Sequence, residues 1–528
     1  MTPHPRLFPL HVRRQDGFTL IELLVVIVIL GVLSAIVVFS VKGIGDKGRK
    51  EAVAADAATL RTAEESFCAK YGHYGTIEEL IKHGFLAGEP EHNMVAVGEE
   101  NKCGRGPNSS YTLYDTSPSE SAADAIQVAG ATDVVVDEKA NRVYVASMGT
   151  NSVTVIDGKT DKVIGTPINV SSAVSVPDRI AVNPGTGQVY VGGTGGVAII
   201  DTANGNQVTR VENFNTKVSG LAVSPENGDV YIGGGASDVA YIAAGDSKAT
   251  TIPLPAGGRV VGASAGMDFS FDAKRHEVYF TKLGPGSGAS PNIGLFAISS
   301  QTHQVRLVAD FPTKSGCSAS SGYGHLMVGS ARGSTAVDPN RSLVYLLAKK
   351  CTQDPVRPTP DQIGTTIVIN PSDGTSRAID DAVGVSSAPT SAVYSAAAGS
   401  VYLFTATSGN EQCGLSAGRI SQIREAKVTR QAPVCSLSSA STGNQAHKVV
   451  LLNSFNRVFV AQRRIEAEEN IPGSPGGLGV ADGTTLLTQA PLGTPSEFVS
   501  LAVNNSTAKV YAVNLKNNRV EVFRTGSA

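Results

Sequence analysis

The pattern of apolar positions divides the chain into three parts. Residues 18–41 are almost all apolar. Residues 48–72 instead place apolar side chains three or four positions apart, as one face of an α-helix requires. These positions are Val53, Ala57, Leu60, Ala63 and Phe67. From residue 125 onward, short alternating segments are separated by turns rich in Asp, Asn, Pro and Gly, which is typical of β-strands. The pattern therefore predicts a helical N-terminal part followed by a large all-β body.

Residues 18–41 are long enough to cross a membrane as a helix. At about 1.5 Å per residue they reach roughly 36 Å, and a hydrocarbon core is about 30 Å thick. A secretory signal peptide has a shorter apolar core that ends at small residues. Arg13 and Arg14 precede the span, so we expect the N-terminus inside the cytoplasm and the rest of the chain exported.

Glu22 is the one charged residue inside this predicted span. An ionisable group within a membrane is costly and is by default a functional hypothesis. The segment Gly17-Phe18-Thr19-Leu20-Ile21-Glu22 resembles the N-terminal signal of type IV pilins and pseudopilins. The resemblance implies that a prepilin peptidase cuts between Gly17 and Phe18 and methylates Phe18. It also implies that Glu22 neutralises the terminal amine of a neighbouring pilin subunit. The alternative is a plain signal anchor.

The resemblance to pseudopilins continues beyond the span. It implies a long N-terminal helix whose second half packs on a small antiparallel sheet. The segment YGHYGTIEELIKHGFL predicts a short helix over Glu78 to Ile81, capped by Gly84 and followed by two apolar core residues, Phe85 and Leu86. Strands are predicted at Asn93–Val97 and Ser109–Tyr114.

The β-body repeats one unit of a short strand, a turn and a second strand with an aromatic residue. These aromatics recur roughly every 50 residues, a period typical of propeller blades. They are Tyr144, Tyr190, Tyr231, Tyr279, Tyr345, Tyr402, Phe459 and Tyr511. The V-Y-V pattern followed by V-x-V-I-D resembles the YVTN family of β-propeller repeats. We therefore expect eight blades, or seven if the unit of Tyr402 or Phe459 is incomplete.

The last repeat supplies three strands and leaves an exposed edge. We predict that Ala125–Val128 pairs with Arg519–Phe523 and closes the ring. Insertions at residues 312–333 and 349–364 are expected to form enlarged loops. The predicted architecture is thus an α+β pilin-like module followed by an all-β propeller. Its parts are a leader (1–17), the membrane half of the helix (18–41), a head (42–114), a linker (115–124) and the propeller (125–528).

Net charge and cysteine content limit the kinds of binding partner and the compartment that we expect. A net charge of −2 gives no reason to expect nucleic acid. The six cysteines all follow the predicted span, where export permits disulfides. Sequence neighbours suggest three pairs, although six cysteines allow 15 connectivities. The pairs are Cys68 with Cys103, Cys317 with Cys351, and Cys413 with Cys435.

Residues suited to catalysis or metal binding are sparse. The nine histidines form no H-x-x-x-H pair, and His276 is expected to be an exposed turn residue. Asp157, Asp201 and Asp482 stand at strand ends and are expected to cap turns. We expect neither a cofactor nor a metal. The competing hypothesis is a structural calcium ion held by the oxygen-bearing residues of the linker. These are Asp115, Ser117, Ser119 and Glu120.

The leading functional hypothesis is a minor or tip subunit of a type IV pilus or related filament. Its propeller would serve adhesion or ligand binding, with a polysaccharide or a protein as surface partner. The precursor would cross the cytoplasmic membrane once, and the mature protein would lie in a surface filament or on the envelope. The alternative is a pseudopilin of a type II secretion system whose propeller contacts cargo. A second alternative is an envelope enzyme hosted by the propeller.

Overall fold

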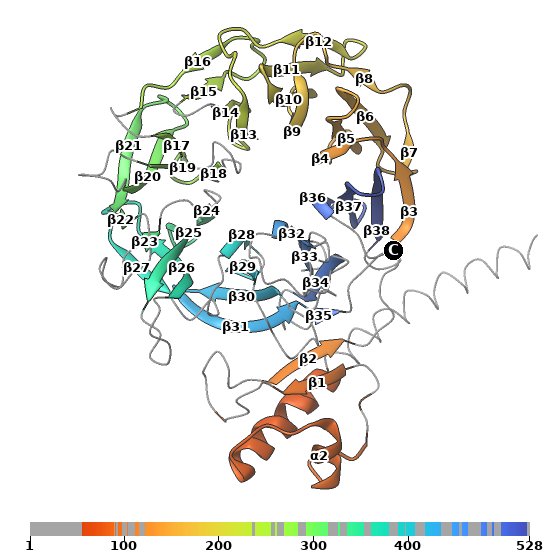
Figure 1. The fold of residues 1–528 in the computed structure, drawn as a ribbon, viewed down its shortest axis with the longest axis vertical. Helices are drawn as coiled ribbons and strands as arrows, with labels where there is room; N and C mark the ends of the chain where they lie inside the picture. The colour runs from red at the N-terminus through yellow and green to blue at the C-terminus, as the bar shows by residue number, and fades with distance from the viewer. Residues whose placement is uncertain are drawn as a thin grey trace, which may run out of the picture. The chain divides into compact units, whose positions relative to one another are not determined.

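The computed structural model describes the head and most of the propeller. The described residues are 55–88, 90, 93–97, 103, 111–115, 122–234, 238–254, 259–260, 269–283, 292–314, 326–327, 335–352, 361–379, 389–396, 398–406, 418–434, 446–453, 457–462, 477–482, 488–489 and 498–524. Their strands form eight sheets arranged around one axis (Figure 1). The prediction of an eight-bladed propeller is confirmed, and the units of Tyr402 and Phe459 are both complete sheets.

The first four blades follow one another along the chain. Blade 1 contains β4 (Ala131–Asp137), β5 (Arg142–Ser147), β6 (Ser152–Asp157), β7 (Lys162–Val163) and β8 (Ile168–Asn169). Blade 2 contains β9 (Ser175–Asn183), β10 (Gln188–Thr194), β11 (Gly196–Asp201) and β12 (Gln207–Arg210). Blade 3 contains β13 (Val218–Val223), β14 (Val230–Gly234), β15 (Asp238–Ile242) and β16 (Ala249–Thr251). Blade 4 contains β17 (Arg259–Val260), β18 (Ser270–Asp272), β19 (Glu277–Leu283), β20 (Ile293–Ser299) and β21 (Val305–Phe311).

The other four blades complete the ring. Blade 5 contains β22 (Thr313–Lys314), β23 (Leu326–Met327), β24 (Thr335–Asp338), β25 (Leu343–Thr352), β26 (Asp361–Ile369) and β27 (Ser376–Ile379). Blade 6 contains β28 (Pro389–Ser395), β29 (Ser400–Ala406), β30 (Gly418–Arg424) and β31 (Lys427–Val434). Blade 7 contains β32 (Ala446–Leu452), β33 (Arg457–Gln462), β34 (Gly477–Asp482) and β35 (Thr488–Gln489). Blade 8 contains β36 (Phe498–Asn504), β37 (Lys509–Asn514), β38 (Arg519–Arg524) and β3 (Ala122–Gln127).

The turn between the first two strands of a blade follows from its sequence. An Asp or Asn side chain accepts backbone N–H groups two or three residues ahead, as Asp137 does from Ala140 at 3.0 Å and Asn183 from Gly185 at 2.9 Å. The residue just before the second strand has left-handed backbone, with φ of 50° at Asn141 and 73° at Gly187. This local chemistry helps to fix the register of the hairpin, and the aromatic of the second strand packs against the next blade, as Tyr144 of blade 1 does against blade 2.

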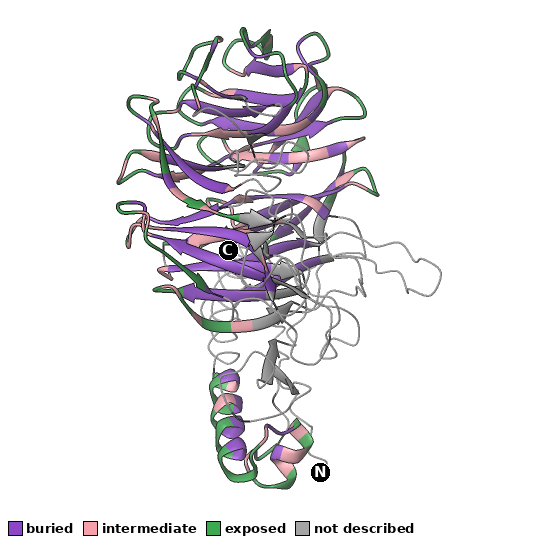
Figure 2. Cartoon of the chain, turned by 60° about the vertical axis from the view of Figure 1, so that its left-hand side comes forward, coloured by how far each residue is buried: buried purple, intermediate pink, exposed green. Residues whose placement is uncertain are grey.

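The apolar core lies between blades rather than at the axis. Each of eight buried clusters joins two consecutive blades, and one of them joins blade 8 to blade 1. The eight repeat aromatics are all buried: Tyr144 is 1% exposed, and the other seven are 0% exposed. Buried strands lie inside and exposed turns lie at the rim (Figure 2).

Blade 8 is completed by a strand from the other end of the propeller segment. β3 pairs antiparallel with β38, with Ile126 opposite Val520 and Gln127 opposite Arg519. The predicted ring closure is confirmed. β3 starts at Ala122, inside the segment 115–124 that was predicted to be a linker. The last three residues of that segment therefore belong to a strand.

A buried ionic cluster strengthens the same junction. Asp161, after β6 of blade 1, accepts from Lys509 Nζ at 2.8 Å, Tyr511 Oη at 2.9 Å and Arg524 at 2.7 Å. The Asp161 side chain is 1% exposed. Three donors from blade 8 therefore converge on one carboxylate of blade 1.

The expectation of an enlarged loop over residues 349–364 is wrong at both ends of that range. β25 and β26 stay paired through Lys349–Gly364, Cys351–Gln362 and Thr352–Asp361. The insertion lengthens a β-hairpin because its residues continue the ladder of backbone hydrogen bonds. Residues 353–360 lie outside the described residues.

Candidate functional site

The predicted processing and assembly residues, Gly17, Phe18 and Glu22, lie outside the described residues. So does the predicted span, residues 18–41. Within the described part of the chain, no helix combines the length and apolarity needed to cross a membrane. The site can be built from residue 55 onward, which lies within the amphipathic helix predicted over residues 48–72.

The helix of residues 55–71 buries the face that the sequence predicts. Ala57, Leu60, Ala63 and Phe67 are 0 to 5% exposed, while Val53 lies outside the described residues. Phe67 contacts Phe85 edge-on, with ring centroids 5.3 Å apart. The packing core of the head is therefore confirmed at these positions.

The short helix α2 (Ile77–Lys82) is also confirmed. Thr76 and Glu79 form a capping box, in which each side chain accepts the other's backbone N–H. Gly84 has φ of 75° just beyond the helix, and Leu86 is buried against the core.

Two strands follow α2, β1 (Asn93–Val97) and β2 (Tyr111–Asp115), and they are paired antiparallel as predicted. β2 also pairs in parallel with β35 at Tyr114 and Asp115.

A disulfide links the end of the long helix to the loop after β1. Cys68 and Cys103 are bonded, with Cα atoms 5.6 Å apart. Closing a loop of this length stabilises a fold by about 3–4 kcal/mol in the chain-entropy account. This predicted pair is confirmed. Cys351 is also disulfide-bonded, whereas Cys317, Cys413 and Cys435 lie outside the described residues.

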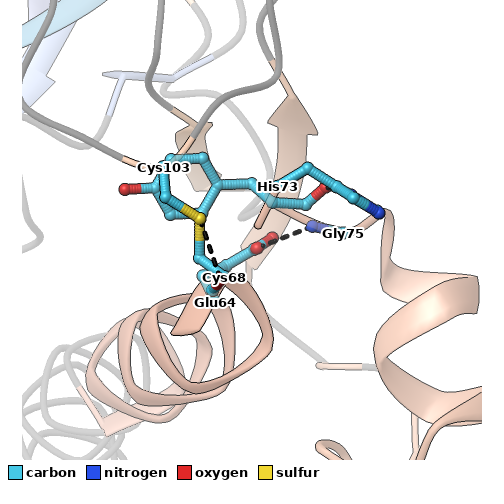
Figure 3. The surroundings of a disulfide bond; sticks show 6 residues. Glu64, Cys68, His73, Gly75 and Cys103 are labelled. Atoms are coloured by element: carbon cyan, nitrogen blue, oxygen red, sulfur yellow. Dashed lines mark hydrogen bonds between the residues drawn. A yellow bond between two sulfur atoms is a disulfide. The ribbon is translucent and has the colours of Figure 1, made fainter. Parts of the chain in front are cut away.

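Glu64 is a buried carboxylate one helical turn before Cys68 (Figure 3). Its Oε2 accepts the Gly75 backbone N–H at 3.0 Å, and its Oε1 meets no donor among the described residues. Burial raises the pKa of Glu64 to about 7, against the lowering effect of the Gly75 hydrogen bond. Near neutral pH, Glu64 is thus divided between its charged and neutral forms.

Comparison with known proteins decides what the N-terminal segment is. Residues 12–38 match the family model of the prokaryotic N-terminal methylation motif. The chain begins with a prepilin-type signal. This motif contains Gly17, Phe18 and Glu22, so the resemblance noted in the sequence is confirmed. Such a motif implies a membrane-anchored precursor, processing by a prepilin peptidase and assembly with other pilin subunits.

Relatives of the prepilin-type segment are secretion pseudopilins. The type II secretion system core protein G of Dickeya chrysanthemi is 37% identical over 84 residues, which is 15% of this chain and 55% of the relative. That of Aeromonas hydrophila is 39% identical over 82 residues, 15% of this chain and 57% of the relative. The chain spans about half the length of the curated relatives it matches.

Two solved structures are similar to most of this chain at low sequence identity. The Kuenenia stuttgartiensis hydrazine synthase is similar over 77% of this chain and 98% of its own, with 12% identity and a TM-score of 0.41. The dihydro-heme d1 dehydrogenase NirN is similar over 78% and 82%, also with a TM-score of 0.41. Likenesses of this size support no conclusion about function.

The predicted turn residues of the propeller behave as expected where they are described. Asp157 Oδ1 accepts the N–H of Thr160 at 2.8 Å and of Lys159 at 2.9 Å, and these bonds lower its pKa. A bond from the Asn204 amide likewise lowers the pKa of Asp201. His276 is a half-exposed turn residue with φ of 55° that pairs with Glu226. The Asp482 side chain lies outside the described residues.

The candidate calcium residues fall mostly outside the described part of the chain: Ser117, Ser119 and Glu120 lie there, as does the side chain of Asp115. Among the described residues, no group of three or more His, Cys, Asp or Glu is arranged to hold a metal.

Glu64 is the functional candidate that sequence reasoning missed. It stands four residues after Leu60 and three before Phe67, on the apolar face of the helix. A carboxylate on that face was the feature of the sequence that could have identified it.

Proposed function

We propose that this protein is a minor or tip subunit of a type IV pilus or related filament, which displays its propeller for adhesion or ligand binding. One observation carries the proposal: a prepilin-type motif at residues 12–38 and a closed eight-bladed ring belong to one chain. The motif supplies the means of entering a filament. The ring supplies a rigid platform, since its ends are joined by β3 and β38.

Size favours a minor position in the filament. The propeller occupies residues 122 to 524, most of the chain. Pilin-type subunits pack through their N-terminal helices, so a body this large on every subunit would crowd its neighbours. A place at the tip, or at wide intervals, removes that conflict.

Connection lengths support one end of the propeller as the binding face. We call the end at which the innermost strands begin the start face. Here the chain passes from Gln462 of β33 to Gly477 of β34, and from Val434 of β31 to Ala446 of β32. At the other end the links are short, as from Asp338 of β24 to Leu343 of β25. The inserted segment 312–333 connects blades 4 and 5 at the start face, and long connections on a rigid scaffold commonly carry specificity.

We further propose that the propeller binds its partner without turning it over. Several described carboxylates and histidines of the propeller are engaged in turns and ion pairs, such as Asp157 in its turn and His303 with Asp229 at 3.0 Å. Binding at the start face, and not turnover of a substrate, is therefore the activity to test first.

A second candidate is a pseudopilin of a type II secretion system whose propeller contacts cargo. The similarity of the N-terminal segment to core protein G favours it. Both candidates share processing and helix-mediated assembly, and they differ in where the propeller ends up.

Immunogold labelling of the propeller on intact cells tests the proposal. A pilus subunit places gold at tips or at intervals along extracellular filaments. Label confined to the envelope, together with loss of a secreted protein in the deletion strain, would favour the secretion alternative instead. Mass spectrometry of the labelled material must find Phe18 as the N-terminus, and Gly17→Glu must leave the precursor uncut.

A further inference from the structure

Polar side chains form a continuous arc across five innermost strands at the start face. The polar arc consists of Lys448, Ser500, Asp133, Asp178, Arg179 and Ser219, from blades 7, 8, 1, 2 and 3. Four of these strands, β32, β36, β4 and β13, have a register shift beside the arc residue. Such bulges re-aim side chains, and here the same irregularity recurs at the same place in the repeat.

Hydrogen bonds link the arc from blade to blade. Ser500 Oγ donates to Asp133 Oδ1 at 2.6 Å, and Lys448 Nζ donates to Ser500 Oγ at 3.2 Å. Asp133 Oδ2 accepts the backbone N–H of Ile180 at 3.1 Å, which brings blade 2 into the arc. Arg179 Nε then donates to the Ser219 carbonyl at 3.3 Å. The arc is thus a built arrangement whose charges are held in place.

Asp178 is the member whose bonding is incomplete. Its Oδ1 is buried and meets no donor among the described residues, and its Oδ2 lies 3.9 Å from Arg179. Burial raises the pKa of Asp178, while Arg179 and Lys217 lower it. The side chain as a whole is 24% exposed, so a donor from outside can approach it, and a buried acceptor without a donor is costly to leave unmade.

The rim next to Asp178 is aliphatic. Val176 is 47% exposed and has φ of 50°, a backbone conformation that is strained for a β-branched residue. Its N–H donates to Asn151 Oδ1 at 2.8 Å, which ties it to the turn that also carries Met148, 42% exposed. Two apolar side chains are therefore presented to solvent beside the charged arc.

We propose that the polar arc, with Met148 and Val176 at its rim, binds an extended polypeptide segment of a partner protein. A peptide supplies N–H groups to Asp178 and carbonyl oxygens to Lys448 and Arg179, whose side chains are 39% and 33% exposed, and its apolar side chains cover the rim. This inference rests on the proposed function, because it names the partner class of the same displayed propeller.

The composition of the site favours a peptide over a glycan. The arc offers both carboxylate acceptors, at Asp133 and Asp178, and cationic donors, at Lys448 and Arg179, which suits the mixed N–H and C=O groups of a peptide backbone. Sugar rings are commonly held on exposed aromatic faces, and the large apolar side chains exposed on the described propeller are Met148, Val163, Ile164, Val176 and Leu307, all aliphatic. A flexible Met and a branched Val suit peptide side chains better.

The test uses the full-length protein in detergent, a phage library of short unstructured peptides, and a glycan array. Wild type is expected to enrich peptides from the library. Asp178→Asn and Lys448→Met are each expected to weaken binding of the best synthetic peptide by at least about tenfold, the loss of one charged hydrogen bond. Lys162→Met removes the same charge from exposed strand β7 and should leave binding unchanged.

Stability separates recognition from folding. Asp178→Asn removes a poorly paired buried charge, so its melting temperature is expected to hold or rise while binding falls. Enrichment of glycans without peptides, or equal peptide binding by wild type and both arc variants, would overturn the inference. A negative peptide result would not change where the propeller is labelled on cells. Absence of the propeller from filaments would not change its affinity for peptides. Peptide binding and filament display can therefore be refuted separately.

Discussion

Glu64 and Asp161 are both almost fully buried, yet their surroundings differ. Asp161 accepts from two cations and a tyrosine hydroxyl. Glu64 accepts one backbone N–H within an apolar helix face. Burial without a cation favours the neutral form of a carboxyl group, and burial among cations makes the charged form indispensable. The two residues should therefore respond in opposite ways to loss of charge.

Glu64→Gln should remove the pH dependence of the head's folding stability. The folded pKa of about 7 exceeds the ordinary value of 4.5, so the folded state holds the extra proton between these values. Head stability is then highest below about pH 4.5 and falls as pH rises toward 7. Hydrogen exchange of helix 55–71 should show protection falling by about one to two orders of magnitude from pH 5 to 8 in wild type. Protection in Glu64→Gln should stay level, and Glu78→Gln, at an exposed position of α2, should behave like wild type.

Asp161→Asn should weaken the junction between blades 1 and 8. The change leaves Lys509 and Arg524 without their shared anion, and breaking a buried ion pair in this way costs about 3–5 kcal/mol. Urea unfolding of the propeller should show an earlier midpoint. Asp157→Asn, in the same turn but only partly buried, keeps a capping oxygen and should shift the midpoint much less. Equal midpoints for the two variants would contradict the role given to the ionic cluster.

At the scale of elements, the closing strand β3 has a testable contribution. A chain starting at Ser121 retains all of β3, and one starting at Val128 removes it while leaving β4 intact. The shorter chain exposes the edge of β38, so it should melt several degrees lower and aggregate through that edge. Ile126→Asp in the longer chain places a charge at a buried position of β3 and should reproduce part of the loss. Coincident melting curves for all three would mean that closure adds no stability.

Local patterns explain why much of the fold could be predicted. Turn residues such as Asp137 and helix positions such as Leu60 act on neighbours a few residues away, so their sequence context suffices. The closing strand was predictable because an unpaired edge needs a partner. The polar arc was not, since Ser500 and Asp133 meet only once the ring is closed. The hairpin of β25 and β26 was mistaken for a loop because its charged, Cys-containing end lacks an alternating pattern.

At the scale of the whole molecule, Glu22 should govern assembly without affecting export. Glu22→Leu makes the predicted span more apolar, so insertion and cleavage after Gly17 should proceed. Incorporation into filaments should fall because the terminal amine of a neighbouring subunit loses its counter-charge. Fractionation of cells into membrane and sheared-filament pools measures both steps. Wild-type levels of Glu22→Leu in the filament pool would contradict the proposed pairing, and Glu22→Asp serves as the charge-retaining control.

The pairing of β3 with β38 also has a consequence for synthesis. β3 leaves the ribosome first among the propeller strands, and its partner residues Arg519 to Phe523 come last. At about 5–20 residues per second, the chain between Gln127 and Arg519 takes roughly 20–80 s to appear. Throughout that interval β3 has no partner and blade 8 does not exist. Contacts of such long range also slow folding itself. The newly synthesised propeller therefore passes through an open state, in which the edge of β3 stays unpaired until the last strand of the ring has been made.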